Sequence, residues 1–300
     1  MQRLGFLAAV AAAILFGVGG TFAQFLFQHR GFSIDWLVTM RLLGAGSVLL
    51  LLSAIRQGRG VFAIWRSDAG AIMIFGLLGM MPVQYTYMAA IEASNTATAT
   101  VLQFTAPAMI AVWFAFARRR LPDRRALAAI ALAMLGTALL VTHGRSGALS
   151  ISALALFWGL ASAVAAAFNS IQPAGLLRRY DTATVGGWGM LVGGFALSLV
   201  HPPWRFEGVW DTTGAFFFAF ILLFGTLAAF YAYIAALRLI GPQMTSLLSC
   251  AEPLAAALLA VLWLRVPWGA MDWLGMSCVL ATIGLLAKAE PRAVQTEKVT

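Results

Sequence analysis

Apolar residues in this chain come in blocks of about 20, the length at which a helix crosses the hydrocarbon of a bilayer. Short loops rich in Arg, Pro, Gly and Asp separate the blocks. Hydrophobic residues make up 61% of the sequence and charged residues only 10%, whereas soluble domains have about half and a quarter. Pro and Gly inside the blocks, and the lack of residue-by-residue alternation, argue against transmembrane β-strands. The sequence therefore predicts an all-α integral membrane protein.

Ten transmembrane helices are expected, and Lys and Arg fix their orientation. With the N-terminus in the cytoplasm, 15 of these residues lie on the cytoplasmic side and 4 on the other, which is the asymmetry that orients membrane proteins. Both termini are then cytoplasmic, and 293–300 is a cytoplasmic tail. As an alternative, Thr21-Phe22-Ala23 weakly resembles a signal-peptide cleavage site, which would leave nine spans. The expected limits are 4–26, 34–55, 68–91, 94–116, 123–142, 151–173, 182–200, 212–238, 242–264 and 271–288.

Similar segments also recur in the sequence at an offset of about half its length. The third expected helix contains YTYMAAI at 85–91, and the eighth contains YAYIAAL at 231–237. The same offset carries Pro107 onto Pro253. Because each half holds five helices, the second half enters the membrane from the opposite side. We therefore predict two inverted five-helix repeats, 1–146 and 147–292, around a central cavity that forms the substrate path.

Polar and aromatic residues share one face on several of the expected helices. Burying polar groups in hydrocarbon costs free energy, so such faces are expected to line the bundle interior or a wet cavity. In the fourth helix, for example, Thr96, Thr100 and Gln103 recur at helical spacing. The residues predicted to line one substrate cavity are Gln84, Tyr87, Thr100, Gln103, Trp158, Ser162, Asn169, Tyr233, Ser249 and Glu252.

Each of these residues also has a structural interpretation. Ser and Thr can bond their own backbone, tyrosines can belong to an interfacial belt, and Trp158 can serve packing alone. Glu252 is the one carboxylate expected near the middle of a span. It could be neutral, carry a coupling proton, contact a substrate amine, or bond the broken backbone beside Pro253. Arg41 could snorkel or pair within the bundle, or bind a substrate carboxylate.

Prolines inside the expected spans mark bends, because each removes a backbone hydrogen bond. Pro82, Pro107 and Pro253 are predicted hinges about which one half rocks against the other, with static packing kinks as the alternative. Pro242 follows Gly241 and is expected to begin the ninth helix, where its missing donor is harmless.

Segments in both halves resemble EamA-type members of the drug/metabolite transporter superfamily. The Glu252-Pro253 pair and Arg41 also resemble residues found in members of that family. The resemblance implies ten helices, cytoplasmic termini, a central cavity, and export of amino acids or other small metabolites. The segments that carry it are TATVLQFTAPA at 98–108, ALFWGLASAVAAAF at 155–168 and LLSCAEPLAAALLA at 247–260.

The sequence thus predicts a bacterial inner-membrane secondary transporter that exports small metabolites by alternating access. Neutral or aromatic amino acids are the first candidate substrates. Multidrug efflux is the alternative, because a cavity rich in Trp, Phe and Met suits lipophilic cations too, and concentrative uptake comes third. A channel is disfavoured because the chain shows neither charged rings nor a carbonyl filter.

An enzyme is not expected, because such a protein needs a reactive cluster. The three histidines, His29, His143 and His201, fall in separate loops and the acids are dispersed. The same scatter predicts no metal site, and no cofactor is expected. The net charge of +9 is not a nucleic-acid footprint, because the arginines flank the spans. The expected partners are a small-molecule substrate and the lipid bilayer, and a monomer is compatible with the sequence.

Overall fold

The computed structural model describes residues 2–94, 96–119, 124–142, 152–255 and 269–288, and within these ranges every regular element is a helix. Two of the elements, η2 and η3, are π-helical, and η1 is a 3₁₀ turn. The elements are α1 (Gln2–Arg30), α2 (Ile34–Gln57), η1 (Gly58–Phe62), α3 (Ala63–Ser67), α4 (Ala69–Ile74), η2 (Phe75–Met80), α5 (Met81–Ala93), α6 (Thr96–Gln103), α7 (Ala106–Arg118), α8 (Arg124–Thr142), α9 (Ala153–Ile171), α10 (Ala174–Arg179), α11 (Thr182–Val200), α12 (Thr212–Leu222), η3 (Leu223–Ala228), α13 (Ala229–Leu248) and α15 (Ala270–Lys288).

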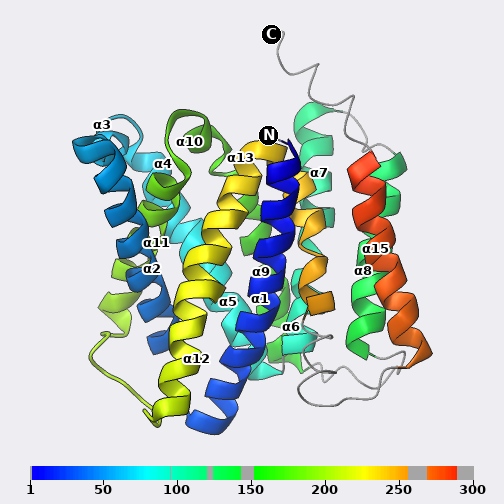
Figure 1. Ribbon diagram of the computed structural model, residues 1–300, viewed down its shortest axis with the longest axis horizontal. Coiled ribbons are helices and arrows are strands. Elements are labelled where there is room, and N and C mark those ends of the chain that lie inside the picture. The colour runs from blue at the N-terminus through cyan, green and yellow to red at the C-terminus, as the bar shows by residue number, and fades with distance from the viewer. Residues whose placement is uncertain (1, 95, 120–123, 143–151, 256–268, 289–300) are drawn as a thin grey trace.

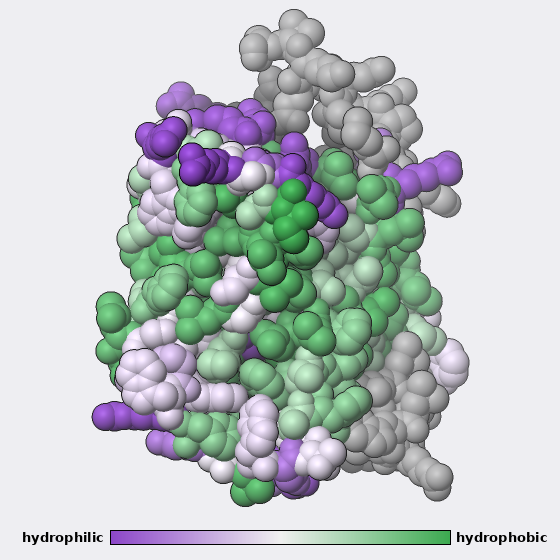
Figure 2. Space-filling model, turned by 60° about the vertical axis from the view of Figure 1, so that its left-hand side comes forward, coloured by the Kyte–Doolittle hydropathy of each residue, from purple (hydrophilic) through white to green (hydrophobic). Residues whose placement is uncertain are grey.

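Among the described residues, seven helical stretches are long and apolar enough to cross a membrane, and Ala270–Ile283 is a shorter apolar helix. Figure 2 shows the matching surface, an apolar belt between polar residues gathered at the two ends of the bundle. The prediction of an all-helical membrane protein is therefore confirmed. The count of ten stays a prediction, because the expected helix 242–264 extends outside the described residues. The expected tail 293–300 lies outside them as well. The seven stretches are Gln2–Arg30, Ile34–Ser67, Ala69–Ala93, Thr98–Ala117, Ala153–Arg179, Thr182–Val200 and Thr212–Leu248.

The helices pack in pairs. α1 lies against α13, α5 against α9, α2 against α11, and α8 against α15, with the last pair at one side of the bundle (Figure 1). Small residues permit the closest approaches, as is usual between membrane helices. A Cβ added at Gly46 of α2 would lie 3.0 Å from the carbonyl oxygen of Gly187 in α11, and one at Gly19 of α1 would lie 3.1 Å from Cα of Gly225.

Two helices break beside the prolines that the repeat relates. α6 ends at Gln103, and Pro107 is the second residue of α7. In the second half, residues 249–250 form a turn after α13, and Pro253 lies in the helical residues 251–255 that follow. Because Pro has no N–H to donate, a helix that restarts at this point has one donor fewer without an intrahelical acceptor. The bends are therefore present, and a hinge role for these prolines remains a prediction.

The other two prolines have different surroundings. Pro82 is the second residue of α5, and α5 directly follows the π-helical η2, so the chain remains helical there. Gly241 has φ 79° and ψ 168°, which kinks α13 immediately before Pro242. The positive φ explains why glycine occupies this position. The kink falls at the predicted boundary between 212–238 and 242–264.

Candidate functional site

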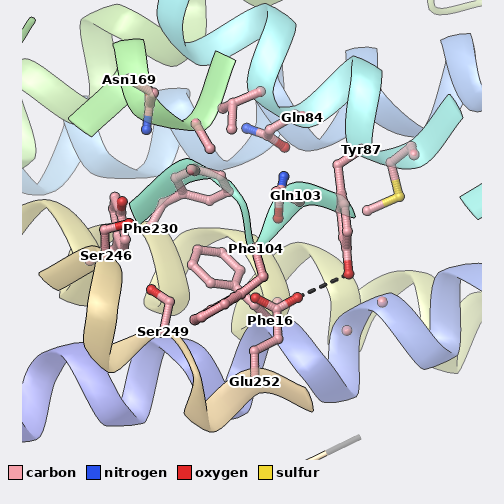
Figure 3. Close-up of a pocket in the computed structure, with 18 of the residues that line it drawn as sticks. Phe16, Gln84, Tyr87, Gln103, Phe104, Asn169, Phe230, Ser246, Ser249 and Glu252 are labelled. Atoms are coloured by element: carbon pink, nitrogen blue, oxygen red, sulfur yellow. Dashed lines mark hydrogen bonds between the residues drawn. The ribbon is translucent and has the colours of Figure 1, made fainter. Parts of the chain in front are cut away.

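A cavity of about 90 Å³ lies among α1, α2, α5, α9, α13 and the two broken helices (Figure 3). Most of the residues predicted from the sequence meet here, although they come from both halves of the chain. The convergence follows from the packing of α1 on α13 and of α5 on α9. The predicted residues that line the cavity are Gln84, Tyr87, Gln103, Asn169, Tyr233, Ser249 and Glu252.

Three predicted residues are not among those that line the cavity. Thr100 lies behind it, with its hydroxyl 2.8 Å from the Tyr87 hydroxyl. Ser162 donates to the carbonyl of Gly159 at 2.7 Å in its own helix, which is the backbone bonding that the sequence left open as an alternative. Trp158 packs edge-on against Tyr85, with ring centroids 5.9 Å apart.

Glu252 is joined to the first half of the chain through Tyr87. The Tyr87 hydroxyl donates to Glu252 Oε1 at 2.9 Å, the bond drawn as a dashed line in Figure 3. Glu252 follows the turn at 249–250, and its own N–H donates to the carbonyl of Ser249 at 2.9 Å. The break in the helix therefore carries the carboxyl group to the cavity wall. The repeat partner of Tyr87, Tyr233, instead shares a hydrogen bond of 2.6 Å with Ser170.

Arg41 also lines the cavity and does not snorkel to the surface. Its side chain is only 3% exposed. Nε donates to Thr226 Oγ1 at 2.7 Å, and Nη2 lies 3.5 Å from the carbonyl oxygen of Gly225. Both partners belong to η3, where the wider π-turn lets Thr226 donate its own hydroxyl to Ile221, five residues earlier. The two groups that hold Arg41 are neutral, so they leave its charge uncompensated.

Several buried polar atoms at the cavity have no hydrogen-bond partner among the described residues. They are both side-chain heteroatoms of Gln84, Oδ1 of Asn169 and Nη1 of Arg41. Leaving such a group unpaired costs about 1–3 kcal/mol, and native proteins rarely do so without a reason. Their convergence on one cavity indicates a place for water or a polar ligand.

Aromatic rings form another part of the wall, and the sequence analysis did not identify these residues. Phe16, Phe104 and Phe230 line the cavity, and Phe16 packs edge-on against Phe230 with centroids 4.8 Å apart. Apolar residues are abundant on every face of these helices, so their sequence carries no signal for these three. Ser246 lines the cavity too, and its spacing of three residues from Ser249 could have indicated it.

The described residues hold no group of three or more His, Cys, Asp or Glu side chains that could bind a metal ion. The chemistry that the cavity offers is recognition: one guanidinium, one carboxyl, unpaired amides and aromatic faces.

Comparison with known proteins adds a family and a fold. The profile of the EamA-like transporter family matches residues 3–142 and again 153–288. A Salmonella typhimurium (strain LT2) protein named uncharacterized inner membrane transporter YicL is 42% identical over 290 residues, which cover 95% of each chain. A protein of known crystal structure is similar with a TM-score of 0.76 at 17% identity, over 97% of this chain and 99% of that one, which shows likeness of fold alone.

Proposed function

Since this chain belongs to the EamA-like transporter family, we propose that it exports small metabolites, with neutral or aromatic amino acids as the first candidate substrates. The observation that carries the proposal is the cavity, in which unpaired polar groups lie beside aromatic rings, enclosed by helices long enough to cross a membrane. A small polar metabolite would satisfy the polar groups and pack its apolar part on the rings.

Alternating access is the proposed mechanism, with the ten helices arranged as two inverted halves, 1–146 and 147–292. The family profile supports two halves because it matches twice along the chain. The helix pairs support a two-fold relation between the halves, because exchanging the halves turns the α1–α13 pair into the α9–α5 pair and leaves the α2–α11 and α8–α15 pairs unchanged. The broken helices beside Pro107 and Pro253 supply equivalent points about which the halves can rock.

The size of the cavity supports such movement. Ligand pockets commonly measure about 300–1,000 Å³, whereas this cavity measures about 90 Å³. A whole amino acid therefore enters only when the helices around the cavity part.

Location and orientation belong to the same proposal. The relative's name places that relative in the inner membrane, and we propose the same location for this protein. The charge asymmetry supports cytoplasmic termini. The start of α1 and the end of α15 lie at the same end of the bundle in Figure 1, as an even number of crossings requires.

Multidrug efflux is the second candidate, and one observation favours it. Glu252 lies among the rings of Phe16, Phe104 and Phe230, and a carboxyl group among aromatic faces attracts a lipophilic cation. Arg41 on the same cavity disfavours it, because a guanidinium repels such a ligand.

Transport in proteoliposomes tests the proposal. The purified protein is reconstituted, and counterflow of a labelled amino acid is competed with other amino acids, tetraphenylphosphonium and sugars. We expect neutral or aromatic amino acids to compete, and the lipid-exposed control Phe195→Ala to behave as wild type. Competition by tetraphenylphosphonium with none by any amino acid would replace the proposal with efflux of cations.

A further inference from the structure

Two residues of opposite charge line the same cavity without compensating one another. Arg41 is 3% exposed and Glu252 is 7% exposed. Within the described part of the chain, neither side chain takes part in an ion pair. A buried charge without a partner is costly, so a ligand that brings an anionic group to Arg41 and a cationic group to Glu252 would stabilise both side chains in their charged forms.

The donors of Arg41 show what its half of the site lacks. Nε and Nη2 point to neutral oxygens of η3, which fix the direction of the guanidinium plane. Nη1 is buried without an acceptor. A guanidinium held in this way keeps N–H donors for a further ligand, and its planar fork matches the two oxygens of a carboxylate.

The carboxyl of Glu252 presents the opposite requirement. It receives one hydrogen bond, from the Tyr87 hydroxyl, and contacts no Lys or Arg among the described residues. Its oxygens face the cavity in Figure 3. An ammonium group would supply the missing positive charge and further donors.

Tyr87 places the two charges within reach of one small molecule. Its hydroxyl bonds to Glu252 at 2.9 Å, and Tyr87, Arg41 and Glu252 all line the same cavity of about 90 Å³. One turn before it, Gln84 carries an amide with both heteroatoms unpaired. Arg41 as a partner for a carboxylate, Glu252 as a partner for an ammonium group, and the amide of Gln84 therefore line one cavity, next to its aromatic rings.

We propose that Arg41 and Glu252 bind the two charged ends of a zwitterionic substrate, with the carboxylate on Arg41 and the ammonium on Glu252. The inference rests on the proposed function and narrows it. Arg41 makes the protein select amino acids over amines, and Glu252 makes it select amino acids over carboxylic acids. A lipophilic cation would leave the charge of Arg41 uncompensated and would be repelled by it. A simple carboxylate would leave the charge of Glu252 uncompensated and would be repelled by that residue.

Three ligands that share one side chain test the assignment. The amino acid that competes best in the counterflow assay is compared with its amine and with its deaminated acid. For phenylalanine these are phenethylamine and 3-phenylpropionate. On wild-type protein we expect each analogue to compete at least about tenfold more weakly than the amino acid, because each leaves one buried charge unpaired.

The variants must then change preference in opposite directions. Arg41→Gln should lose the preference for phenylalanine over phenethylamine and keep the preference for phenylalanine over 3-phenylpropionate. Glu252→Gln should keep the preference over phenethylamine and lose the preference over 3-phenylpropionate. Arg41→Lys, which retains the charge without the fork, should fall between wild type and Arg41→Gln. Arg30→Gln and Glu92→Gln remove the same groups outside the cavity and should keep both preferences.

The possible failures are distinguishable. If wild type transports an amino acid but binds each of the two analogues as well as it binds that amino acid, the zwitterion assignment is overturned and the proposed function stands. If wild type transports tetraphenylphosphonium and no amino acid, both are overturned. Should the variants misfold, as size-exclusion chromatography would show, the preference of wild type among the three ligands still decides the assignment.

Discussion

Replacing Thr226 by Val tests how Arg41 is held at the cavity. Thr226 is fully buried, and its hydroxyl accepts from Arg41 Nε at 2.7 Å. Val keeps the branching and nearly the volume but removes this acceptor. A hydrogen bond to a charged group contributes about 1.5–3 kcal/mol in soluble proteins, and membrane helices show about 0.6–1.7 kcal/mol for interhelical bonds. We expect Thr226→Val to lower the free energy of unfolding by about 1–2 kcal/mol.

Thr282→Val provides the matched control. Thr282 is equally buried, but its hydroxyl donates only to the carbonyl of Cys278 in its own helix, at 2.9 Å. That carbonyl belongs to a continuous helix and keeps its backbone partner. The substitution should therefore change the free energy of unfolding by less than about 0.5 kcal/mol.

Unfolding by a denaturing detergent, followed by circular dichroism in micelles, measures both variants against wild type. The difference between them isolates the bond to Arg41 from the general effect of replacing a buried hydroxyl. Equal losses in the two variants, or a loss confined to Thr282→Val, would refute the account of Arg41 as a side chain anchored by η3. Ligand binding gives a second readout, because a displaced guanidinium should weaken binding of the amino acid in Thr226→Val alone.

Three further predictions concern the cavity and the polar ends of the bundle. Glu252→Gln should weaken counterflow of the amino acid itself; intact counterflow with loss of transport driven by a pH gradient would assign Glu252 a coupling proton instead. Cysteine at Asn169 should react with a small polar thiol reagent and be protected by substrate, whereas cysteine at the lipid-exposed Phe195 should show no protection; equal reactivity with and without substrate would contradict the cavity assignment. The N–H of Gly214, at the start of α12, holds the pKa of Asp211 below its usual range. The stabilisation from Asp211 is therefore present above the ordinary carboxyl pKa and lost as pH falls through the lowered value, so Asp211→Asn should flatten the acid limb of a thermal-stability profile measured against pH.

The hydrophobic blocks predicted where helices lie, because a helix in lipid must satisfy its backbone internally and so occupies the whole apolar block. The expected helix 182–200 has the limits of α11, and 34–55 differs from α2 by two residues at one end. The blocks could not predict the π-helical turns of η2 and η3. A single extra residue in a turn changes hydrogen bonding between carbonyls and N–H groups, and it leaves the apolar composition unchanged.

Helical spacing predicted much of the cavity because buried amides and acids are costly wherever they do not face polar surroundings. It could not separate Ser249, which lines the cavity, from Ser162, which does not, because both hydroxyls donate to a backbone carbonyl three or four residues earlier. Both are small hydroxyls on a helix in lipid, and their roles differ only through the neighbouring helix. Arg41 was left between snorkelling and binding for the same reason, since its partners in η3 lie far from it in the sequence.

The family profile matches each half of the chain, but the charges of the cavity are not repeated. Tyr87 and Tyr233 match between the halves and both line the cavity. The correspondence that pairs Pro107 with Pro253 places Ala106 opposite Glu252, so the carboxyl has no counterpart in the first half. The guanidinium of Arg41 is likewise anchored by η3, whereas the equivalent π-turn η2 packs closely on α11 through Gly76. A repeated scaffold can open equivalently to either side of the membrane, and a site with its positive and negative groups in single copies holds a ligand in one orientation.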